Sequence, residues 1–353
     1  MRGNHEVGSF FEASKPCDYK GRPGRIPWEQ HGPAVYLETG RQALRSIVED
    51  LCGKGVHTVY LPGFLCDSML DPFRESPLDI VFFSMKPNLQ IDPIDLARLA
   101  QSSERWGYAV MIARYFGHAR DSTYMTEIKR LREMGVQVVE DLTHTIFDET
   151  KSEANYTFAS LRKLLPLATG AFVTGVESFH DQSTKVPARS IHEEIWQCMD
   201  DKRLFIDGEA DRGNFYDRYM AANEALERVI APRAMDARSM LLLSNLPYSE
   251  FARKRERNYA ILSEAVASIA DIRVVNDIDM MTPTHLVVAE VRPKNLRQAL
   301  ARRGIYCPVH WPRPRMLPDR LSWPSGHFSI PIDQRYDSDD MKYIATTLEE
   351  LCR

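Results

Sequence analysis

The sequence predicts an α/β protein, with a large domain built on a mostly parallel, doubly wound sheet and a smaller C-terminal α/β domain. Two observations lead to this fold class. Apolar runs of strand length alternate with amphipathic, helix-like segments through the first half of the chain, as in parallel sheets covered by helices on both faces. The chain has 353 residues, which is more than one hydrophobic core usually serves. We therefore expect an N-terminal arm over residues 1–34, the large domain over 35–235 and the small domain over 236–353.

Composition and charge exclude several classes of function. Apolar residues make up 44% and charged residues 27% of the chain, as in ordinary globular proteins. A net charge of −4 gives no electrostatic reason to expect a nucleic acid or a membrane surface as partner. No apolar run reaches the roughly 18 residues of a membrane span, and the N-terminus lacks the apolar core of a signal peptide. The six cysteines are scattered without metal-type spacing, so we expect a cytoplasmic protein with reduced thiols and no metal site.

The large domain can be predicted element by element. Thr39 is a suitable N-cap for an amphipathic helix over 39–52, whose apolar residues share one face. Asp121 is a candidate cap and Gly135 a candidate stop for a later helix. The remaining elements are strands over 57–63, 79–85, 108–117 and 136–141, and helices over 93–101, 121–135, 191–206 and 214–230.

The small domain is predicted to begin with a helix over 249–269. Its other elements are strands over 271–275, 285–291, 305–311 and 327–332, and helices over 295–304 and 337–352.

The stretch 136–175 carries the candidate chemistry. Its first residues, VQVV, read as a buried strand that ends in Glu140 and Asp141. Neighbours on a strand point to opposite faces, so only one of these acids can face the crevice where such sheets bind ligands. A polar loop then leads to Ser160, Arg162 and Lys163, ahead of an apolar run, AFVT. An acid, a crevice, a lysine and a hydroxyl that can hold an anion are what a pyridoxal phosphate (PLP) enzyme needs.

The chemistry of PLP explains this choice of residues. PLP acts as an electron sink only while its pyridine nitrogen stays protonated, and we assign Asp141 to that role. The lysine that binds PLP needs a neutral amine, and we assign Lys163, which lies beside the cation Arg162. A plainer interpretation is a solvated basic pair, but the flanking segments FAS and LLPLATGAF are too apolar for a free surface run.

Six motifs carry a resemblance to a known family: LETGRQAL (37–44), RYFG (114–117), VVEDLTH (138–144), ASLRKLLPLATGAF (159–172), YCPVHWP (306–312) and SIPIDQRY (329–336). Together they resemble the DegT/DnrJ/StrS family of PLP-dependent aminotransferases, of fold type I, from about Val7 to the C-terminus. The resemblance implies a Schiff base between PLP and Lys163, glutamate as amino donor, a nucleotide-linked keto-sugar as acceptor, and a homodimer with sites built from both subunits. Relatives that dehydrate sugars carry His in place of the lysine, so Lys163 indicates transamination.

The resemblance also assigns residues to the cofactor's phosphate. In the family, the start of the helix near residue 40 holds the phosphate through backbone amides, which places Gly40, Arg41 and Gln42 at this group. The family's usual phosphate-binding serine position is occupied here by Phe158. Two hydroxyls remain as alternatives for the phosphate, Ser160 and Thr157.

Other assignments concern the ring and the substrate. The family places an aromatic residue against the cofactor ring at the position of Cys66, so the stacking residue is left open between Cys66 and Phe64. His144 occupies the position of a family Gln or His beside the ring hydroxyl or the substrate. His310 and Trp311 are candidates for substrate contact. For Phe64, His310 and Trp311, plain packing in the core is the alternative interpretation.

Several motifs of other enzyme classes are absent. The sequence has no G-x-x-x-x-G-K-[ST] loop, no G-x-G-x-x-G after a strand, no H-E-x-x-H and no G-x-S-x-G. Two hypotheses remain beside the aminotransferase. One is another PLP-dependent reaction on an amino acid, such as decarboxylation, elimination or condensation, which would use the same Lys163 and Asp141. The other is a binding or regulatory relative that keeps the fold without the cofactor.

Overall fold

The computed structural model describes residues 6–14, 24–91, 98, 106–119, 122–177, 189–276 and 280–353. In this part of the chain a large sheet is formed by β2 (Val35–Leu37), β3 (Thr58–Pro62), β4 (Asp79–Phe83), β5 (Tyr108–Ala113), β6 (Gln137–Asp141), β7 (Tyr156–Ser160) and β8 (Ala171–Thr174). A smaller sheet is formed by β9 (Ile272–Val274), β10 (His285–Glu290) and β12 (His327–Pro331). A separate pair joins β1 (Val7–Gly8) and β11 (Ile305–Tyr306).

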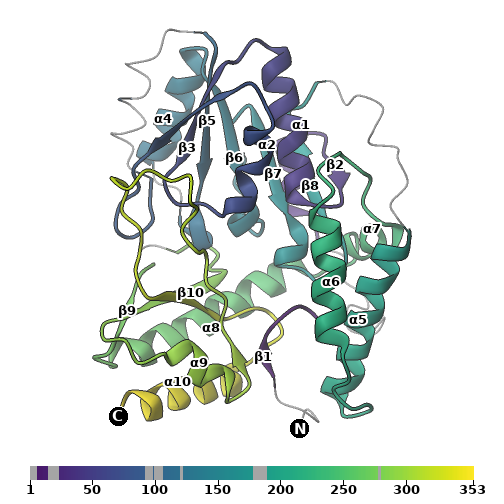
Figure 1. Ribbon diagram of the computed structural model, residues 1–353, viewed down its shortest axis with the longest axis vertical. Coiled ribbons are helices and arrows are strands. Elements are labelled where there is room, and N and C mark those ends of the chain that lie inside the picture. The colour runs from purple at the N-terminus through teal and green to yellow at the C-terminus, as the bar shows by residue number, and fades with distance from the viewer. Residues whose placement is uncertain are drawn as a thin grey trace.

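Helices surround both sheets (Figure 1). The first half of the chain contributes α1 (Gly40–Gly53), α2 (Asp71–Arg74) and α4 (Ser122–Glu133). The second half contributes α5 (Arg189–Asp207), α6 (Phe215–Glu227), α7 (Ala237–Leu243), α8 (Tyr248–Ala267), α9 (Leu296–Ala301) and α10 (Ser338–Cys352). Short 3-10 turns are η1 (Pro27–His31), η2 (Asp67–Met69), η3 (Tyr115–Gly117), η4 (Thr143–Thr145) and η5 (Leu161–Lys163).

The large sheet has the strand order β2-β8-β7-β6-β5-β3-β4. Neighbours from β7 to β4 run parallel, whereas β8 is antiparallel to both β7 and β2. Alternate residues of the central strands pack on opposite sides. Met111 and Val139 lie in one core with α1, while Ile112 and Val138 lie in another with α4. Helices therefore cover both faces, and the predicted mostly parallel, doubly wound sheet is confirmed.

The capped helices form where the sequence predicts them. Thr39 caps α1 through its side chain, which accepts from the Gln42 backbone N–H at 3.3 Å. Asp337 caps α10 in a capping box with Asp340. Gly135 follows α4 with φ of 87°, a left-handed conformation that glycine adopts without strain.

Three predictions about elements need correction or lie outside the described residues. Strand β7 falls inside the stretch interpreted as a polar loop, because its residues are all buried and the Thr157 hydroxyl pairs with Thr174 of the neighbouring strand β8. The strand expected over 305–311 stops at Tyr306, since Pro308 and Pro312 have no N–H for a ladder. The helix predicted over 93–101 lies outside the described residues, apart from position 98. Asp121, the predicted cap of the following helix, also lies outside them.

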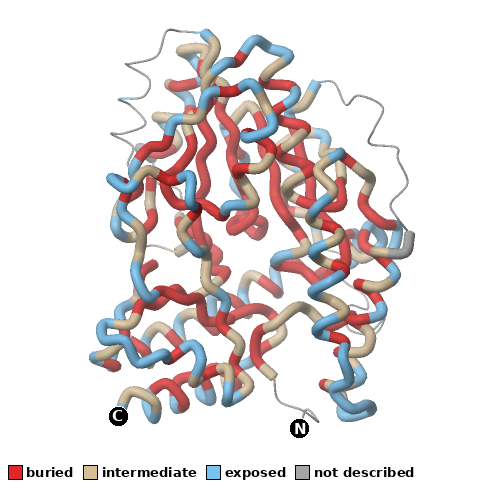
Figure 2. The backbone as a smooth tube through the Cα atoms, viewed as in Figure 1, coloured by how far each residue is buried: buried red, intermediate tan, exposed pale blue. Residues whose placement is uncertain are grey.

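The lower half of the molecule in Figure 1 holds the small sheet with α8, α9 and α10, and α5 and α6 run beside it. Strand β1 pairs in parallel with β11, which places Val7 opposite Ile305 and brings the start of the chain to this half. Buried backbone is concentrated in the strands of the large sheet, as Figure 2 shows. Within the described ranges, no helix has the length and apolar character needed to cross a membrane.

Candidate active site

Two cavities open at the carboxyl end of the parallel strands. The first, of about 420 Å³, is lined by the start of α1, the end of β7, helix α6 and residues 9–11. The second, of about 490 Å³, is lined mainly by the small-sheet half of the molecule. A narrow space of about 10 Å³ shares lining residues with both. Lys163 lines all three, so its side chain lies at their junction.

Lys163 lies just past the end of a strand of the large sheet. It ends the turn η5, directly after β7, and its side chain is exposed to the cavities. Among the described residues it has no hydrogen-bond or ion-pair partner. Its amine is therefore available to a ligand, as the sequence predicts.

Asp141 ends strand β6 and lines the first cavity together with Lys163. Its Oδ1 accepts a hydrogen bond from the Thr143 backbone N–H at 2.8 Å. Burial raises the pKa of the Asp141 carboxyl, while hydrogen bonds from Thr143 and the charge of Lys163 act against this. No described cation forms an ion pair with Asp141, so this carboxylate is left for a ligand that brings a proton or a positive charge.

Glu140 points the other way, as the alternation of a strand requires. Its Oε1 accepts from Arg114 Nε at 3.4 Å, and its Oε2 accepts from the Ser152 hydroxyl. Glu140 is fully buried in these contacts. Of the two neighbouring acids, Asp141 alone faces the cavities.

Two arginines line the first cavity, and each carries a buried donor without a partner. Arg162 donates to Asn223 Oδ1 at 2.7 Å and to the Glu227 carboxylate. Arg41 lies 3.4 Å from carboxylate oxygens of both Asp71 and Glu227. In both arginines the Nε–H is buried and unpaired. Leaving a buried donor unpaired costs about 1–3 kcal/mol, so two of them at one cavity indicate an anionic ligand.

Helix α6 forms a wall of this cavity that the sequence did not identify. Tyr219, Asn223 and Glu227 follow one another at helical-turn spacing and share the face toward the cavity. Burial alone would raise the pKa of the Glu227 carboxyl, but the surrounding cations lower it. The spacing was visible in the sequence, but polar residues at that spacing are equally typical of a solvated helix face.

The predicted anion site at the start of α1 is only partly formed as expected. Gly40 and Arg41 line the first cavity. Gln42 is buried elsewhere: its backbone N–H serves the Thr39 cap, and its side-chain amide donates to Glu38 Oε2 at 3.0 Å. The helix start therefore presents Gly40 and Arg41 to a ligand, while Gln42 supports the helix.

The structure separates the two hydroxyls left open for the phosphate. Ser160 lines the first cavity, and its backbone N–H donates to Thr143 Oγ1 at 3.0 Å. Thr157 Oγ1 lies 2.7 Å from Thr174 Oγ1, in a contact between β7 and β8. Ser160 is thus the hydroxyl that a ligand in this cavity can reach.

The two candidates for ring stacking lie behind the cavity wall. Phe64 is 1% exposed and packs against other rings, with Trp323 at 4.8 Å between centroids. Cys66 Sγ lies 2.8 Å from Ser68 Oγ. Ser68 and its neighbour Met69 are the residues of this segment that line the first cavity.

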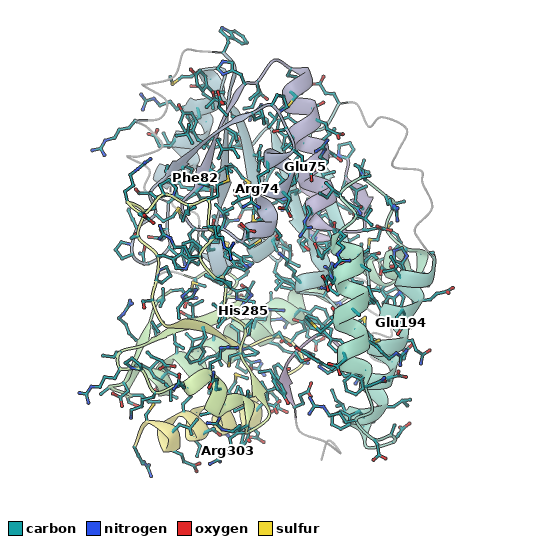
Figure 3. The ribbon with its side chains drawn as sticks, in the orientation of Figure 1. Arg74, Glu75, Phe82, Glu194, His285 and Arg303 are labelled. Atoms are coloured by element: carbon teal, nitrogen blue, oxygen red, sulfur yellow. The ribbon has the colours of Figure 1, made fainter. Side chains whose placement is uncertain are left out.

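The second cavity is lined by His144, His310 and Trp311, the candidates for contact with the ring hydroxyl or the substrate, and also by His285. Trp311 stacks on His144 with centroids 5.7 Å apart and planes at 15°. The rings of His285 and His310 lie 4.5 Å apart. Figure 3 shows His285 at the start of β10, where the small sheet faces the large one. His285 was missed because its closeness to the others arises only in the folded chain.

These histidines are neutral. Burial lowers the pKa of His144, His285 and His310 well below the usual value, and neighbouring cations and imidazoles add to the effect. The Phe116 backbone N–H donates to His144 Nδ1 at 3.0 Å. In the neutral ring, Nε2 of His144 must therefore carry the hydrogen and can act as a donor. Among the described residues, no cluster of His, Cys, Asp or Glu is placed to hold a metal ion.

The residues present fit PLP. The cofactor combines a phosphate, a ring nitrogen that must stay protonated and an aldehyde that reacts with an amine. The first cavity is lined by the cations Arg41 and Arg162, by the buried Asp141 carboxylate, which has no ion-pair partner among the described residues, and by the Lys163 amine. No feature of the described lining conflicts with that group.

Comparison with known proteins identifies the fold. No protein-family model and no curated protein matches the sequence. Solved structures match it over most of the chain, and they share its fold. The similar structures include proteins described as sugar aminotransferases and one described as a DegT DnrJ EryC1 StrS aminotransferase.

Three of these structures illustrate the likeness. The putative sugar aminotransferase Spr1654 from Streptococcus pneumoniae, in its PMP form, has a TM-score of 0.63 at 14% identity, covering 98% of this chain and 92% of its own. CalS13 from Micromonospora echinospora, a sugar aminotransferase, has a TM-score of 0.58 at 14% identity, covering 92% and 88%. A DegT DnrJ EryC1 StrS aminotransferase from Brucella abortus has a TM-score of 0.56 at 14% identity, covering 91% and 86%. At this identity the likeness establishes the fold.

Proposed function

We propose that the protein is a PLP-dependent aminotransferase that takes an amino group from glutamate and transfers it to a nucleotide-linked keto-sugar. The observation that carries this proposal is the position of Lys163. Its unpaired amine lines the same cavity as the unpaired Asp141 carboxylate and two buried arginine donors. Structures of similar fold are named sugar aminotransferases, which supports the class of reaction and of acceptor.

The chain's own residues hold the cofactor in defined ways. Arg41 and Arg162 would place their positive charge beside the phosphate, and Ser160 would add a hydroxyl beside Gly40. Asp141 accepts the hydrogen of the ring nitrogen and keeps that nitrogen charged. When bound, PLP supplies the electron sink that stabilises negative charge at the donor α-carbon.

Lys163 has two roles in this scheme. Its amine would hold the cofactor through the cofactor's aldehyde group. With an amino donor bound in its place, Nζ of Lys163 would act as a general acid–base that moves a proton from the donor α-carbon to the cofactor's aldehyde carbon. The side chain has no competing partner among the described residues, so nothing restrains this movement.

The second cavity receives the substrate. His144 presents an Nε2–H donor beside Lys163, and Trp311 fixes the orientation of that ring. The neutral imidazoles of His285 and His310 can exchange hydrogen bonds with hydroxyl groups, because each has its Nδ1 beside a hydroxyl of the protein. These neutral imidazoles suit the hydroxyl groups of a sugar acceptor.

A homodimer is part of the proposal. Helix α6, which lines the first cavity, exposes Tyr216 and Met220 by 44% and 47%. Helix α7 exposes Leu241 by 70%. Large exposed apolar side chains beside a ligand site are typical of surfaces covered by a partner.

The first experiment is to reduce the PLP-loaded protein with borohydride and map the modified lysine by mass spectrometry. We expect PLP on Lys163, none on Lys163→Ala, and unchanged labelling in Lys151→Ala, an exposed lysine outside the cavities. The visible absorption of the bound cofactor should then bleach when glutamate is added. Labelling elsewhere, or turnover by Lys163→Ala, would contradict the proposal.

The absorption experiment also distinguishes transamination from the second candidate function, another PLP-dependent reaction on an amino acid. Retained absorption with glutamate, together with release of carbon dioxide or of an eliminated group from another amino acid, would indicate a different PLP reaction on the same residues. Spr1654 is described in both a PLP and a PMP form, the two forms between which transamination alternates, and this favours the aminotransferase.

A further inference from the structure

The Thr143 side chain joins the ends of two neighbouring strands at the first cavity. Thr143 is 6% exposed, begins the turn η4 just past β6, and lines this cavity together with Asp141 and Ser160. The pairing of β6 with β7 reaches Asp141 and Phe158, and the Leu142 N–H then donates to the Phe158 carbonyl at 2.8 Å. Past that point β6 has ended, and the Ser160 N–H donates instead to Thr143 Oγ1 at 3.0 Å. The threonine hydroxyl thus takes the place of a strand carbonyl.

Thr143 also holds Asp141, through both its backbone and its side chain. The Thr143 backbone N–H donates to Asp141 Oδ1 at 2.8 Å. Burial raises the pKa of the Asp141 carboxyl, and hydrogen bonds from the Thr143 hydroxyl and backbone N–H are the strongest effects that oppose this rise. Because Oγ1 already accepts from Ser160, the single hydroxyl hydrogen can be donated to the carboxylate. The hydroxyl therefore receives a hydrogen bond from β7 and gives one to the acid that ends β6.

The surroundings of Asp141 make this donor important. No described cation forms an ion pair with Asp141, and a buried carboxylate without charged partners depends on hydrogen bonds to remain ionised. The next threonine of the same turn shows the contrast. Thr145 is also buried, but its hydroxyl donates to the Leu142 carbonyl at 3.5 Å, and it is not among the described lining residues of either cavity. Of the two threonines, Thr143 alone connects with the acid.

We propose that Thr143 is a positioning residue for the cofactor's ring nitrogen, and that its hydroxyl holds the Asp141 carboxylate in place as the acceptor of a ring N–H. The same hydroxyl ties this acceptor to Ser160, so the acid and the hydroxyl assigned to the phosphate keep a fixed separation. The inference rests on the proposed function in taking PLP to be the ligand. It concerns binding alone and requires no turnover.

Equilibrium binding of two compounds tests the inference: PLP, and 1-deazapyridoxal phosphate, in which a C–H replaces the ring nitrogen. Both carry the phosphate and the aldehyde, so they differ in what they offer to Asp141. Fluorescence titration of the full-length, cofactor-free protein should show that the wild type prefers PLP. Thr143→Val keeps the branched shape without the hydroxyl and should reduce this preference about 10-fold, because a hydrogen bond to a charged group is lost. Thr143→Ser keeps the hydroxyl and should retain the preference.

The ratio of the two affinities separates this role from a merely structural one. Loss of the acceptor for the Ser160 N–H would weaken both compounds alike and leave the ratio unchanged. Thr145→Val is the matched control, a buried threonine of the same turn, and should keep the wild-type ratio. Asp141→Asn should remove most of the preference for PLP. Thr143→Val added to Asp141→Asn should then change the ratio no further, since both substitutions act on one contact.

Each outcome decides one claim. A wild-type ratio in Thr143→Val, or a further loss of preference when it is added to Asp141→Asn, would overturn the role of Thr143. If Thr143→Val does not fold, Thr143→Ala lacks the same hydroxyl and takes its place in the comparison. Wild-type protein that binds neither compound would overturn the proposed function and this inference with it. A protein that binds PLP without transaminating still yields the ratio, so the two failures are distinguishable.

Discussion

Gly40 lies so close to Ser160 that a Cβ at position 40 would stand 2.9 Å from the Ser160 Cβ. Real Cβ atoms do not approach this closely, and the neighbour belongs to a buried strand that cannot easily move. The first turn of α1 and the end of β7 therefore meet without a side chain between them. This contact shapes the part of the first cavity that faces Arg41 and Arg162.

Gly40→Ala tests this contact. We expect PLP affinity to fall about 10- to 100-fold, since displacement of Ser160 would lose a hydrogen bond to a charged group, worth about 1.5–3 kcal/mol. Gly53→Ala, at the other end of the same helix, meets nothing within 4 Å and should bind PLP normally. Fluorescence titration with PLP measures both. Equal affinity in the two variants would show that the close approach has no role in binding.

Asp141→Asn should have opposite effects on stability and turnover. Burial raises the pKa of Asp141, so in the cofactor-free protein this acid is stabilising at low pH, where it is neutral, and loses that contribution as pH rises through its folded pKa. The amide removes the buried charge and should raise stability at pH 7 by about 1 kcal/mol. Turnover should fall at least about 10-fold, because a charge-assisted hydrogen bond to the cofactor is lost.

The adjacent acid is the control for that prediction. Glu140→Gln breaks contacts with Arg114 and Ser152 on the other face of the sheet and should lower stability by about 3 kcal/mol. Denaturant unfolding of the cofactor-free proteins compares the two variants. A gain in stability from Glu140→Gln, or a loss from Asp141→Asn, would contradict the assignment of faces.

Glu227 should make the protein sensitive to acid. Its pKa is lowered in the fold, so its stabilising effect is complete above the unfolded pKa and is lost as pH falls through the lower folded value. Glu227→Gln should therefore cost about 1–3 kcal/mol at pH 7 and flatten the loss of stability below about pH 4.5. Glu224→Gln, exposed on the same helix, should keep the wild-type profile. Unfolding free energies across this pH range provide the measurement.

Substitution of Phe64 is expected to lower stability, whereas substitution of Met69 is expected to lower the affinity for PLP. Phe64→Ala should cost about 3–5 kcal/mol of stability, because a fully buried ring is lost, and should leave PLP affinity intact under folding conditions. Met69→Ala should do the reverse, since Met69 lines the first cavity. Thermal unfolding and PLP titration on the same samples test this. Loss of PLP by folded Phe64→Ala would restore Phe64 as a cofactor contact.

Local signals predicted much of the fold. Thr39 and Asp337 carry capping oxygens whose partners are a few residues away, so the starts of α1 and α10 are visible in the sequence. The strand with Glu140 and Asp141 was equally clear from its apolar run. Strand β7 was not, because Thr157 resembles a loop residue until the folded sheet pairs its hydroxyl with Thr174.

The candidate site likewise contains residues that local sequence predicts and residues that only the folded structure brings together. Asp141, Ser160 and Lys163 lie within one stretch of sequence, and the structure brings them to one cavity. His285 comes from a distant element of the small-sheet half, and only folding brings it near Lys163. Its chemistry depends on burial, which spacing along a chain does not reveal.

The pairing of β1 with β11 also sets an order of events during synthesis. Val7 has its strand partner only when Ile305 has left the ribosome, and Phe10 is held by Arg335, which comes later still. Ser9 and Phe11 line both cavities, so the walls of both depend on contacts with the C-terminal part of the chain. A chain that ends before Ile305 lacks the partners of Val7 and Phe10, so it lacks the contacts that hold residues 9–11 at the first cavity.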